Sequence, residues 1–193
     1  MRLKSLARWA AGMSKRDHEH YAQGSVRDEV PFVHQNHINL CANASAEMLL
    51  RYHGRPSHLA LKRHADRDDY RIRRNPRGVF SGGNVDTIVG VFRAAGLGAI
   101  LLRPSGQWTA QNLRDTLDAV GPFACYMRSL GGHWVVVHDS DDEHVIFHDP
   151  WKGANKRKTL AHFNRDTDND WDSFVCPGTV APFISGVSAR TAR

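Results

Sequence analysis

Apolar residues recur with a helical period in the first half of the chain and with a strand-like period in much of the second half. Residues 41–53 place their apolar side chains on one face together with Cys41, and Gly54 stands where that helix would end. Three further helices are predicted, over 57–64, 84–95 and 109–120. Strand-like runs fall at 99–102, 123–127, 133–138 and 144–148. This order predicts an α+β fold, with an N-terminal helical half packed on a small C-terminal antiparallel β-sheet.

The stretches between these elements are read as connections. They comprise a short extended segment, a charged surface loop and a long tail, at 30–33, 65–83 and 151–174. Leu160 and Phe163 are expected to anchor the last of these to the core. The chain therefore divides into a basic N-terminal tail, 1–25, and one folded domain, 26–193, a length ordinary for a single domain.

A polar turn at 139–143 joins two of the strand-like runs and predicts a β-hairpin. If the hairpin is centred on Asp141, His133 lies directly opposite Asp149 at its open end. Opposed residues of an antiparallel pair have Cβ atoms about 4.5–5.5 Å apart. Because a carboxylate at that separation reaches an imidazole ring, the register predicts a His133–Asp149 pair.

Cys41 opens the predicted helix at 41–53, and Gln35 lies shortly before it. The N–H groups at a helix start favour a thiolate, and such sites lower a cysteine pKa to about 3.5–7.5. A nearby Gln amide can donate to an oxyanion that forms beside the sulfur. With His133 as general base and Asp149 as the residue that orients it, these four side chains predict nucleophilic catalysis by a cysteine.

Each of the four residues, taken alone, has an ordinary structural explanation. A cysteine at a helix start is commonly a small buried residue, a cross-strand His–Asp pair is commonly structural, and a Gln before a helix is commonly a polar surface residue. The combination, in the order Gln, Cys, His, Asp and on fitting elements, favours the catalytic interpretation. Cys125 in an apolar strand is expected to be inert core, and Cys176 before Pro177 to be incidental.

Three widely spaced cysteines, without paired spacing, predict neither a disulfide framework nor a zinc module, and they suit a reducing compartment. Twelve histidines raise a metal site as the alternative. The candidate ligand sets are His34 with His37 and Cys41, and His138 with His144 and His148. His34 and His37 would point to different sides, and neither set has a second closely spaced ligand pair, so no metal is expected.

The chain carries a formal net charge of +6, but its basic residues are scattered, with denser groups near 71–77 and 152–158. Scattered charge of this size is typical of a solvated surface, so nucleic acid is not an expected partner. No apolar run approaches 18 residues, so no membrane span is expected. The N-terminus lacks the uninterrupted apolar core of a Sec signal peptide.

The residues at these positions resemble a known family. The segment 35–44, Gln-Asn-His-Ile-Asn-Leu-Cys-Ala-Asn-Ala, the strand 132–137, Gly-His-Trp-Val-Val-Val, and His148-Asp149-Pro150 resemble papain-like cysteine peptidases. The resemblance is to the bacterial branch that holds double-glycine leader peptidase domains and avirulence-type cysteine proteases, and it covers about residues 30–175. Leu40 and Ala42 depart from the residues common there, which leaves the chemistry in place and the substrate open.

This resemblance implies a papain-like fold with Cys41 as nucleophile, His133 as general base, Asp149 as orienting residue and Gln35 as oxyanion donor. It implies a thiol hydrolase that cleaves a peptide or isopeptide bond without a cofactor. Its substrate would be a peptide or protein, and an inhibitor or immunity protein is a further possible partner. The alternatives are a deamidase or acyltransferase with the same triad, and a catalytically silent fold that binds a peptide or leader. A bacterial enzyme of this kind would act in the cytoplasm or be secreted as an effector by a specialised system.

Overall fold

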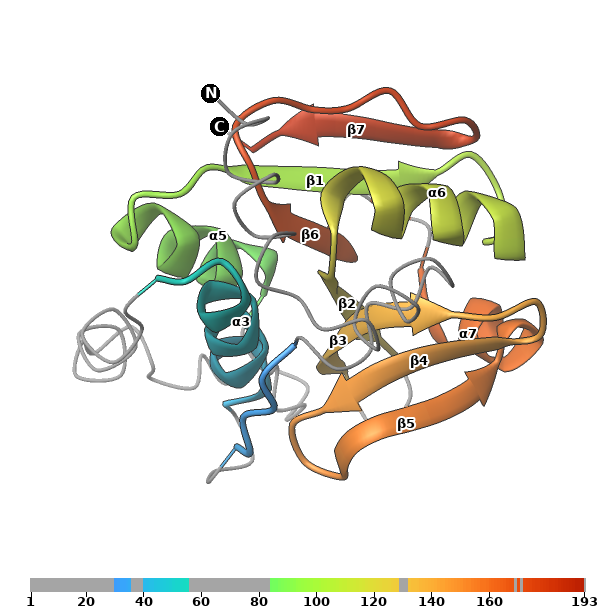
Figure 1. The fold of residues 1–193 in the computed structure, drawn as a ribbon, viewed down its shortest axis with the longest axis horizontal. Helices are drawn as coiled ribbons and strands as arrows, with labels where there is room; N and C mark the ends of the chain where they lie inside the picture. The colour runs from blue at the N-terminus through green and yellow to red at the C-terminus, as the bar shows by residue number, and fades with distance from the viewer. Residues whose placement is uncertain are drawn as a thin grey trace, which may run out of the picture.

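A seven-stranded antiparallel sheet, in the order β5-β4-β3-β2-β6-β1-β7, forms the centre of the described part of the chain (Figure 1). The computed structural model describes residues 30–35, 40–55, 84–128, 132–168, 170 and 172–192. The strands are β1 (Ala99–Pro104), β2 (Phe123–Met127), β3 (His133–Ser140), β4 (His144–Asp149), β5 (Gly153–Thr159), β6 (Phe174–Pro177) and β7 (Val187–Thr191). The helices in these ranges are α3 (Cys41–Tyr52), α5 (Val85–Ala94), α6 (Ala110–Val120) and α7 (Leu160–Asp166).

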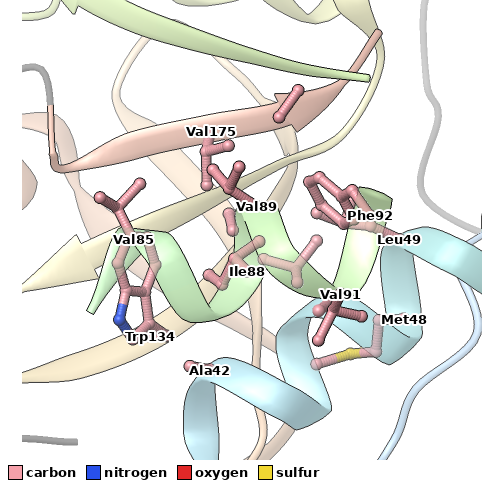
Figure 2. Close-up of a cluster of buried hydrophobic side chains, with 14 of the residues drawn as sticks. Ala42, Met48, Leu49, Val85, Ile88, Val89, Val91, Phe92, Trp134 and Val175 are labelled. Atoms are coloured by element: carbon pink, nitrogen blue, oxygen red, sulfur yellow. The ribbon is translucent and has the colours of Figure 1, made fainter. Parts of the chain in front are cut away.

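Helices α3 and α5 pack against each other and against one face of the sheet (Figures 1 and 2). Trp134 and Val136 of β3 face these helices, because successive residues of a strand point to opposite faces. Phe92 of α5 and Met48 of α3 are fully buried in the same cluster. This packing fixes the helix that begins with Cys41 against the middle of the sheet.

Helices α6 and α7 contribute to a second apolar cluster on the opposite face. Val135 and Val137 of β3 point into it and meet Leu113 of α6 and Phe163 of α7. Phe163 is completely buried, so its predicted role as a core anchor is confirmed, and Leu160 packs against the same cluster while partly exposed. β3, which begins with His133, is therefore covered by apolar side chains on both faces.

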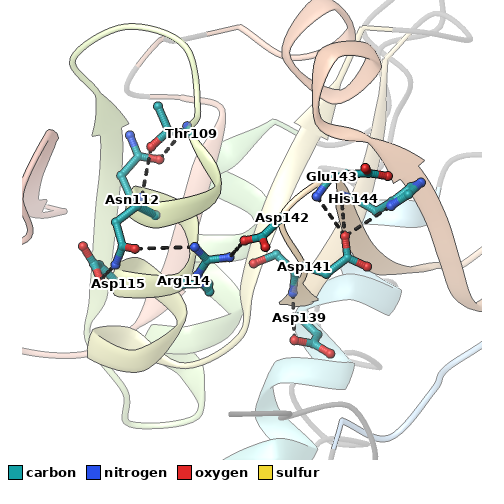
Figure 3. A network of polar contacts seen from close by, with 11 residues as sticks. Thr109, Asn112, Arg114, Asp115, Asp139, Asp141, Asp142, Glu143 and His144 are labelled. Atoms are coloured by element: carbon teal, nitrogen blue, oxygen red, sulfur yellow. Dashed lines mark hydrogen bonds and ion pairs between the residues drawn. The ribbon is translucent and has the colours of Figure 1, made fainter. Parts of the chain in front are cut away.

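Local sequence signals explain where the helices begin and end. Thr109 accepts a hydrogen bond from the Asn112 N–H, and the Asn112 side chain accepts one from the Thr109 N–H, which caps α6 (Figure 3). Arg114 of the same helix pairs with Asp142 in the turn between β3 and β4. Gly54 follows α3 with φ 64°, the left-handed conformation that ends a helix, as predicted.

The α+β fold and the expected helices that fall in the described ranges are confirmed, but the sheet is larger than predicted. The stretch 151–174 is not a tail, because it holds β5, α7 and the start of β6. β5 is an edge strand whose residues are all polar or small and are either exposed or half-buried, so it lacks the apolar alternation that marks a half-buried strand. The predicted helix 57–64 and loop 65–83 lie outside the described residues, as does the predicted tail 1–25.

The predicted hairpin register is wrong. Val136 faces His148 and, after an irregularity at His138, Ser140 faces Val145, so His133 and Asp149 are not directly opposed. The Asp141 carboxylate accepts the N–H groups of the two residues that follow the turn, Glu143 and His144 (Figure 3). This turn moves the centre of the hairpin beyond Asp141 and extends β3 to Ser140.

Candidate active site

Cys41 is the first residue of α3 and is 1% exposed. The hydrogen bonds of the helix begin with the Ala44 N–H to the Leu40 carbonyl, so the N–H groups of the first turn have no acceptor within the helix. Leu40, the N-cap, carries no polar side-chain atom that could cap them. The start of α3 therefore offers backbone N–H donors and the positive end of the helix dipole beside a thiol.

His133, the first residue of β3, joins Cys41 to Asp149. Its Nε2 lies 2.7 Å from Asp149 Oδ1, and the Cys41 side chain lies close enough to the ring to raise the pKa of His133. Since Nε2 is used by the carboxylate, Nδ1 is the ring nitrogen that remains for the sulfur. The ring thus lies between the thiol and the carboxylate, although the register that predicted the His133–Asp149 pair was wrong.

Burial alone would lower the pKa of His133, yet the hydrogen bonds to Asp149 and Cys41, with the charges of both, raise it from 6.5 to about 9. The pKa of Asp149 is lowered, because hydrogen bonds from His133 and from backbone N–H groups outweigh the effect of burial. The arrangement therefore favours the protonated, imidazolium form of His133 beside the Asp149 carboxylate at neutral pH.

Asp149 ends β4, and one of its oxygens collects three donors. Oδ1 accepts from His133 Nε2 and also from the backbone N–H groups of Trp151, at 2.8 Å, and Lys152, at 3.0 Å. Two backbone N–H groups of the turn that follows β4 thus hold the carboxylate in place, and the His133 ring at the start of β3 donates to the same oxygen. Sequence reasoning missed these two N–H groups, whose signal was the Asp-Pro step that often begins a turn.

Gln35 lies beside the same turn. Its backbone N–H donates to the Pro150 carbonyl at 2.9 Å, and its side chain is buried, with 3% of the residue exposed. The bond ties the segment 30–35 to the residue that follows Asp149. All four predicted site residues therefore belong to segments that meet at one end of β3 and β4, near the start of α3.

Two further residues shape this region. A Cβ on Gly132 would lie 2.0 Å from Tyr126 Oη, and the φ of Gly132 is 95°, so only glycine allows β3 to start so close to Tyr126. Burial first, and then the negative charges of Cys41 and Asp168, raise the pKa of Tyr126. Tyr126 packs against the apolar cluster that includes Cys41. Sequence reasoning missed it, since a tyrosine in a strand carries no distinctive signal.

The other two cysteines have no such surroundings. Cys125 and Cys176 are completely buried, and burial raises the pKa of Cys176 to about 12 and that of Cys125 well above its ordinary value. All three cysteines are free thiols. Cys41 is the one that contacts a histidine and lies at a helix start.

The histidine-based metal alternative finds no support in the described ranges, where no three His, Cys, Asp or Glu residues are grouped to hold an ion. The His144 ring is hydrogen-bonded to the Asp141 carboxylate, and the two ring nitrogens of His148 are hydrogen-bonded to backbone groups. His37 lies outside the described residues. In the same part of the chain, none of the helices has the length and apolar character needed to cross a bilayer.

Comparison with known proteins decides the family. The sequence model of a family described as the papain-like cysteine protease AvrRpt2 matches residues 24–168, about three quarters of the chain. The chain belongs to this family. It is a papain-like cysteine peptidase, and the predicted family and enzyme class are confirmed.

Solved structures agree with this peptidase in fold. A double-glycine motif protease from an AMS/PCAT transporter, solved with a leader peptide, is 20% identical with a TM-score of 0.58 over 79% of this chain and 94% of its own. The peptidase domain of Streptococcus ComA, a bifunctional ABC transporter, is 15% identical with a TM-score of 0.51 over 84% and 98%. No curated protein matches this peptidase in sequence.

Proposed function

We propose that this peptidase cleaves a peptide or isopeptide bond with Cys41 as nucleophile, His133 as proton carrier, Asp149 as orienting residue and Gln35 as oxyanion donor. The observation that carries the proposal is the position of the His133 ring, whose Nε2 lies 2.7 Å from Asp149 Oδ1 and whose pKa is also raised by the neighbouring Cys41 side chain. A half-buried histidine between a thiol and a carboxylate is the arrangement that thiol catalysis needs.

The chemistry proceeds in two halves. The Cys41 thiolate attacks the carbonyl carbon of the substrate, and the oxyanion that forms accepts hydrogen bonds from the Cys41 N–H and the Gln35 side-chain amide. The carbon–nitrogen bond then breaks as His133 gives its proton to the leaving amine, which leaves a thioester on Cys41. Water attacks the thioester, His133 takes one of its protons, and the acid product departs with the thiolate restored.

A peptide substrate is supported by the family and by the structural likeness to a protease whose structure contains a leader peptide. The Cys41–His133 pair disfavours the silent, peptide-binding alternative, because a binding module has no need for an imidazolium held between a thiol and a carboxylate. Deamidation or acyl transfer would use the same first half and differ only in the group released or in the nucleophile that resolves the thioester.

Covalent labelling tests the nucleophile. Iodoacetamide or an epoxide reagent should modify Cys41 in the folded protein, and Cys125 and Cys176 should stay unmodified because they are buried with raised pKa values. Peptide mapping by mass spectrometry reads the sites, with Asp149→Ala as a variant expected to label slowly. Equal labelling of all three cysteines only after unfolding, with no fast site in the native protein, would contradict the proposal.

The proposal extends to the wider role of the chain. We infer that residues 26–193 form the peptidase domain and that 1–25 is dispensable for catalysis, in keeping with a family match that begins at residue 24. We further propose a secreted bacterial effector, with a protein substrate and an inhibitor or immunity protein as partner. A truncated chain that lacks 1–25 should retain turnover on a peptide library.

A further inference from the structure

His148 lies immediately before the catalytic-site carboxylate Asp149 and is used by neither half of the proposed reaction. It is 2% exposed, and both of its ring nitrogens meet backbone groups. Nε2 lies 2.9 Å from the Val30 carbonyl oxygen, and Nδ1 accepts the Asn155 N–H at 3.2 Å. One ring thus joins the segment that carries Gln35 to the first residues of β5.

These two partners determine the protonation state of the ring. A carbonyl oxygen accepts only, so Nε2 must carry a hydrogen, and an N–H donates only, so Nδ1 must keep its lone pair. The neutral Nε2–H tautomer alone satisfies both bonds. Burial agrees with this geometry, since it lowers the pKa of His148 despite the opposing bond to Val30.

The backbone on both sides is shaped around this ring. Asn155 has φ 49°, and it is the one non-glycine residue with positive φ in the described ranges. That left-handed conformation, which costs free energy, accompanies the contact of its N–H with His148. On the other side, the Phe32 ring contacts the His148 ring edge-on, with ring centroids 5.7 Å apart. The His138 ring also packs against His148, with centroids 4.2 Å apart.

The consequence concerns Gln35. The segment 30–35 touches the end of β4 at Val30 and Phe32 through His148, and at Gln35 through the Pro150 carbonyl. His148 and Pro150 are the two neighbours of Asp149 in the chain, so the oxyanion donor and the orienting carboxylate share one support. A shift of the segment on β4 would move Gln35 relative to Cys41 without disturbing the His133–Asp149 bond.

We propose that His148 is a positioning residue, whose ring holds the segment 30–35 against the end of β4 and thereby sets the position of the Gln35 amide. This inference rests on the proposed oxyanion role of Gln35. Substitution of His148 should therefore lower kcat by displacing the Gln35 amide, and it should leave KM for a small substrate unchanged.

A double-mutant cycle with Gln35→Ala tests it on the full chain. His148→Phe keeps an aromatic ring against Phe32 and His138 but removes both hydrogen bonds, and it should lower kcat about ten-fold, within the range of coupled neighbours. In the Gln35→Ala background the same change should lower kcat less than about two-fold, because the amide it positions is already absent. His148→Gln, with one donor and one acceptor, should recover most of the loss, and His162→Phe on the exposed face of α7 is the control.

The possible outcomes separate the two proposals. If Gln35→Ala leaves kcat unchanged, the oxyanion role fails and this inference fails with it. If Gln35→Ala lowers kcat but His148→Phe has the same effect in both backgrounds, or no effect, only the positioning role is overturned. If His148→Phe does not fold, the cycle is run with His148→Ala at low temperature and with His148→Gln. Equal loss of kcat in those two variants, or additivity with Gln35→Ala, then counts against the inference.

Discussion

Replacing Asp149 by Asn removes a charge beside His133 while keeping an oxygen in the same place. All three donors to Asp149 converge on Oδ1, two of them backbone N–H groups of the following turn. An Asn side chain placed with its oxygen toward Trp151 and Lys152 therefore still accepts from His133 Nε2. The usual cost of such a change in a triad, about 10⁴ in kcat through the wrong histidine tautomer, should not arise here.

The magnitude follows from the electrostatics of His133. The pKa of His133 is raised from 6.5 to about 9. This difference in pKa corresponds to a free energy of about 3 kcal/mol that favours the imidazolium form. Cys41 contributes part of this, so the share lost with the Asp149 charge is roughly 2 kcal/mol, or about 30-fold in kcat/KM. Asp149→Ala removes the acceptor for three donors and should cost about 10³–10⁴.

The assay is the pH profile of kcat/KM for the native enzyme and the two variants on a fluorogenic peptide. The alkaline limb of the native enzyme should lie near the pKa of His133, at about 9, and should move toward 6.5 in Asp149→Asn. Asp142→Asn removes the same charge from an exposed carboxylate in the β3–β4 turn and is the matched control. The reasoning is refuted if Asn and Ala are equally damaging, or if the alkaline limb stays in place.

The remaining predictions concern stability. Cys125→Ala should lower the free energy of unfolding by about 1 kcal/mol, because it leaves a small void in a fully buried strand. Turnover per folded molecule should stay unchanged. A urea melt and an activity assay of the same sample measure the two quantities. The His133–Asp149 pair should stabilise the fold most between about pH 4 and 6.5. Because the pKa of His133 is raised in the fold, its contribution to the free energy of unfolding is lost as the pH rises from 6.5 through about 9. Because the pKa of Asp149 is lowered in the fold, its contribution is lost as the pH falls below 3.8. Urea melts of native and Asp149→Asn protein across that range should show the largest difference inside the window, and a pH-independent difference would contradict the pair as its source.

The proximity of the candidate residues was predictable because they carry chemistry that few others carry. A thiol at a helix start and a His–Asp combination on neighbouring strands are rare together, and the structure brings Cys41, His133 and Asp149 into contact. The correct contact nevertheless followed from a wrong register. His and Asp side chains are long enough to meet across a diagonal of the hairpin, so the pairing tolerated an error of two residues.

The rest depended on information that local patterns do not hold. β5 lies at the edge of the sheet with its polar side chains exposed or half-buried, and only its pairing with β4 makes it a strand. The anchoring of Gln35 and Val30 depends on Pro150 and His148, more than a hundred residues away in the chain. Hydrophobic periodicity and residue propensity in a single sequence report local structure only, so they do not predict contacts between residues this far apart in the chain.

The order of the sheet bears on when the enzyme can become active during synthesis. β1 emerges early, yet its two neighbours in the sheet are β6 and β7, the last two strands of the described part of the chain. The cluster beneath α3 also includes Val175 of β6. The helix that presents the thiol therefore lacks part of its support until the chain has been made through residue 191, and such non-local pairing is slow to form. We therefore expect that a nascent peptidase built in this way completes its site only after β6 and β7 have left the ribosome.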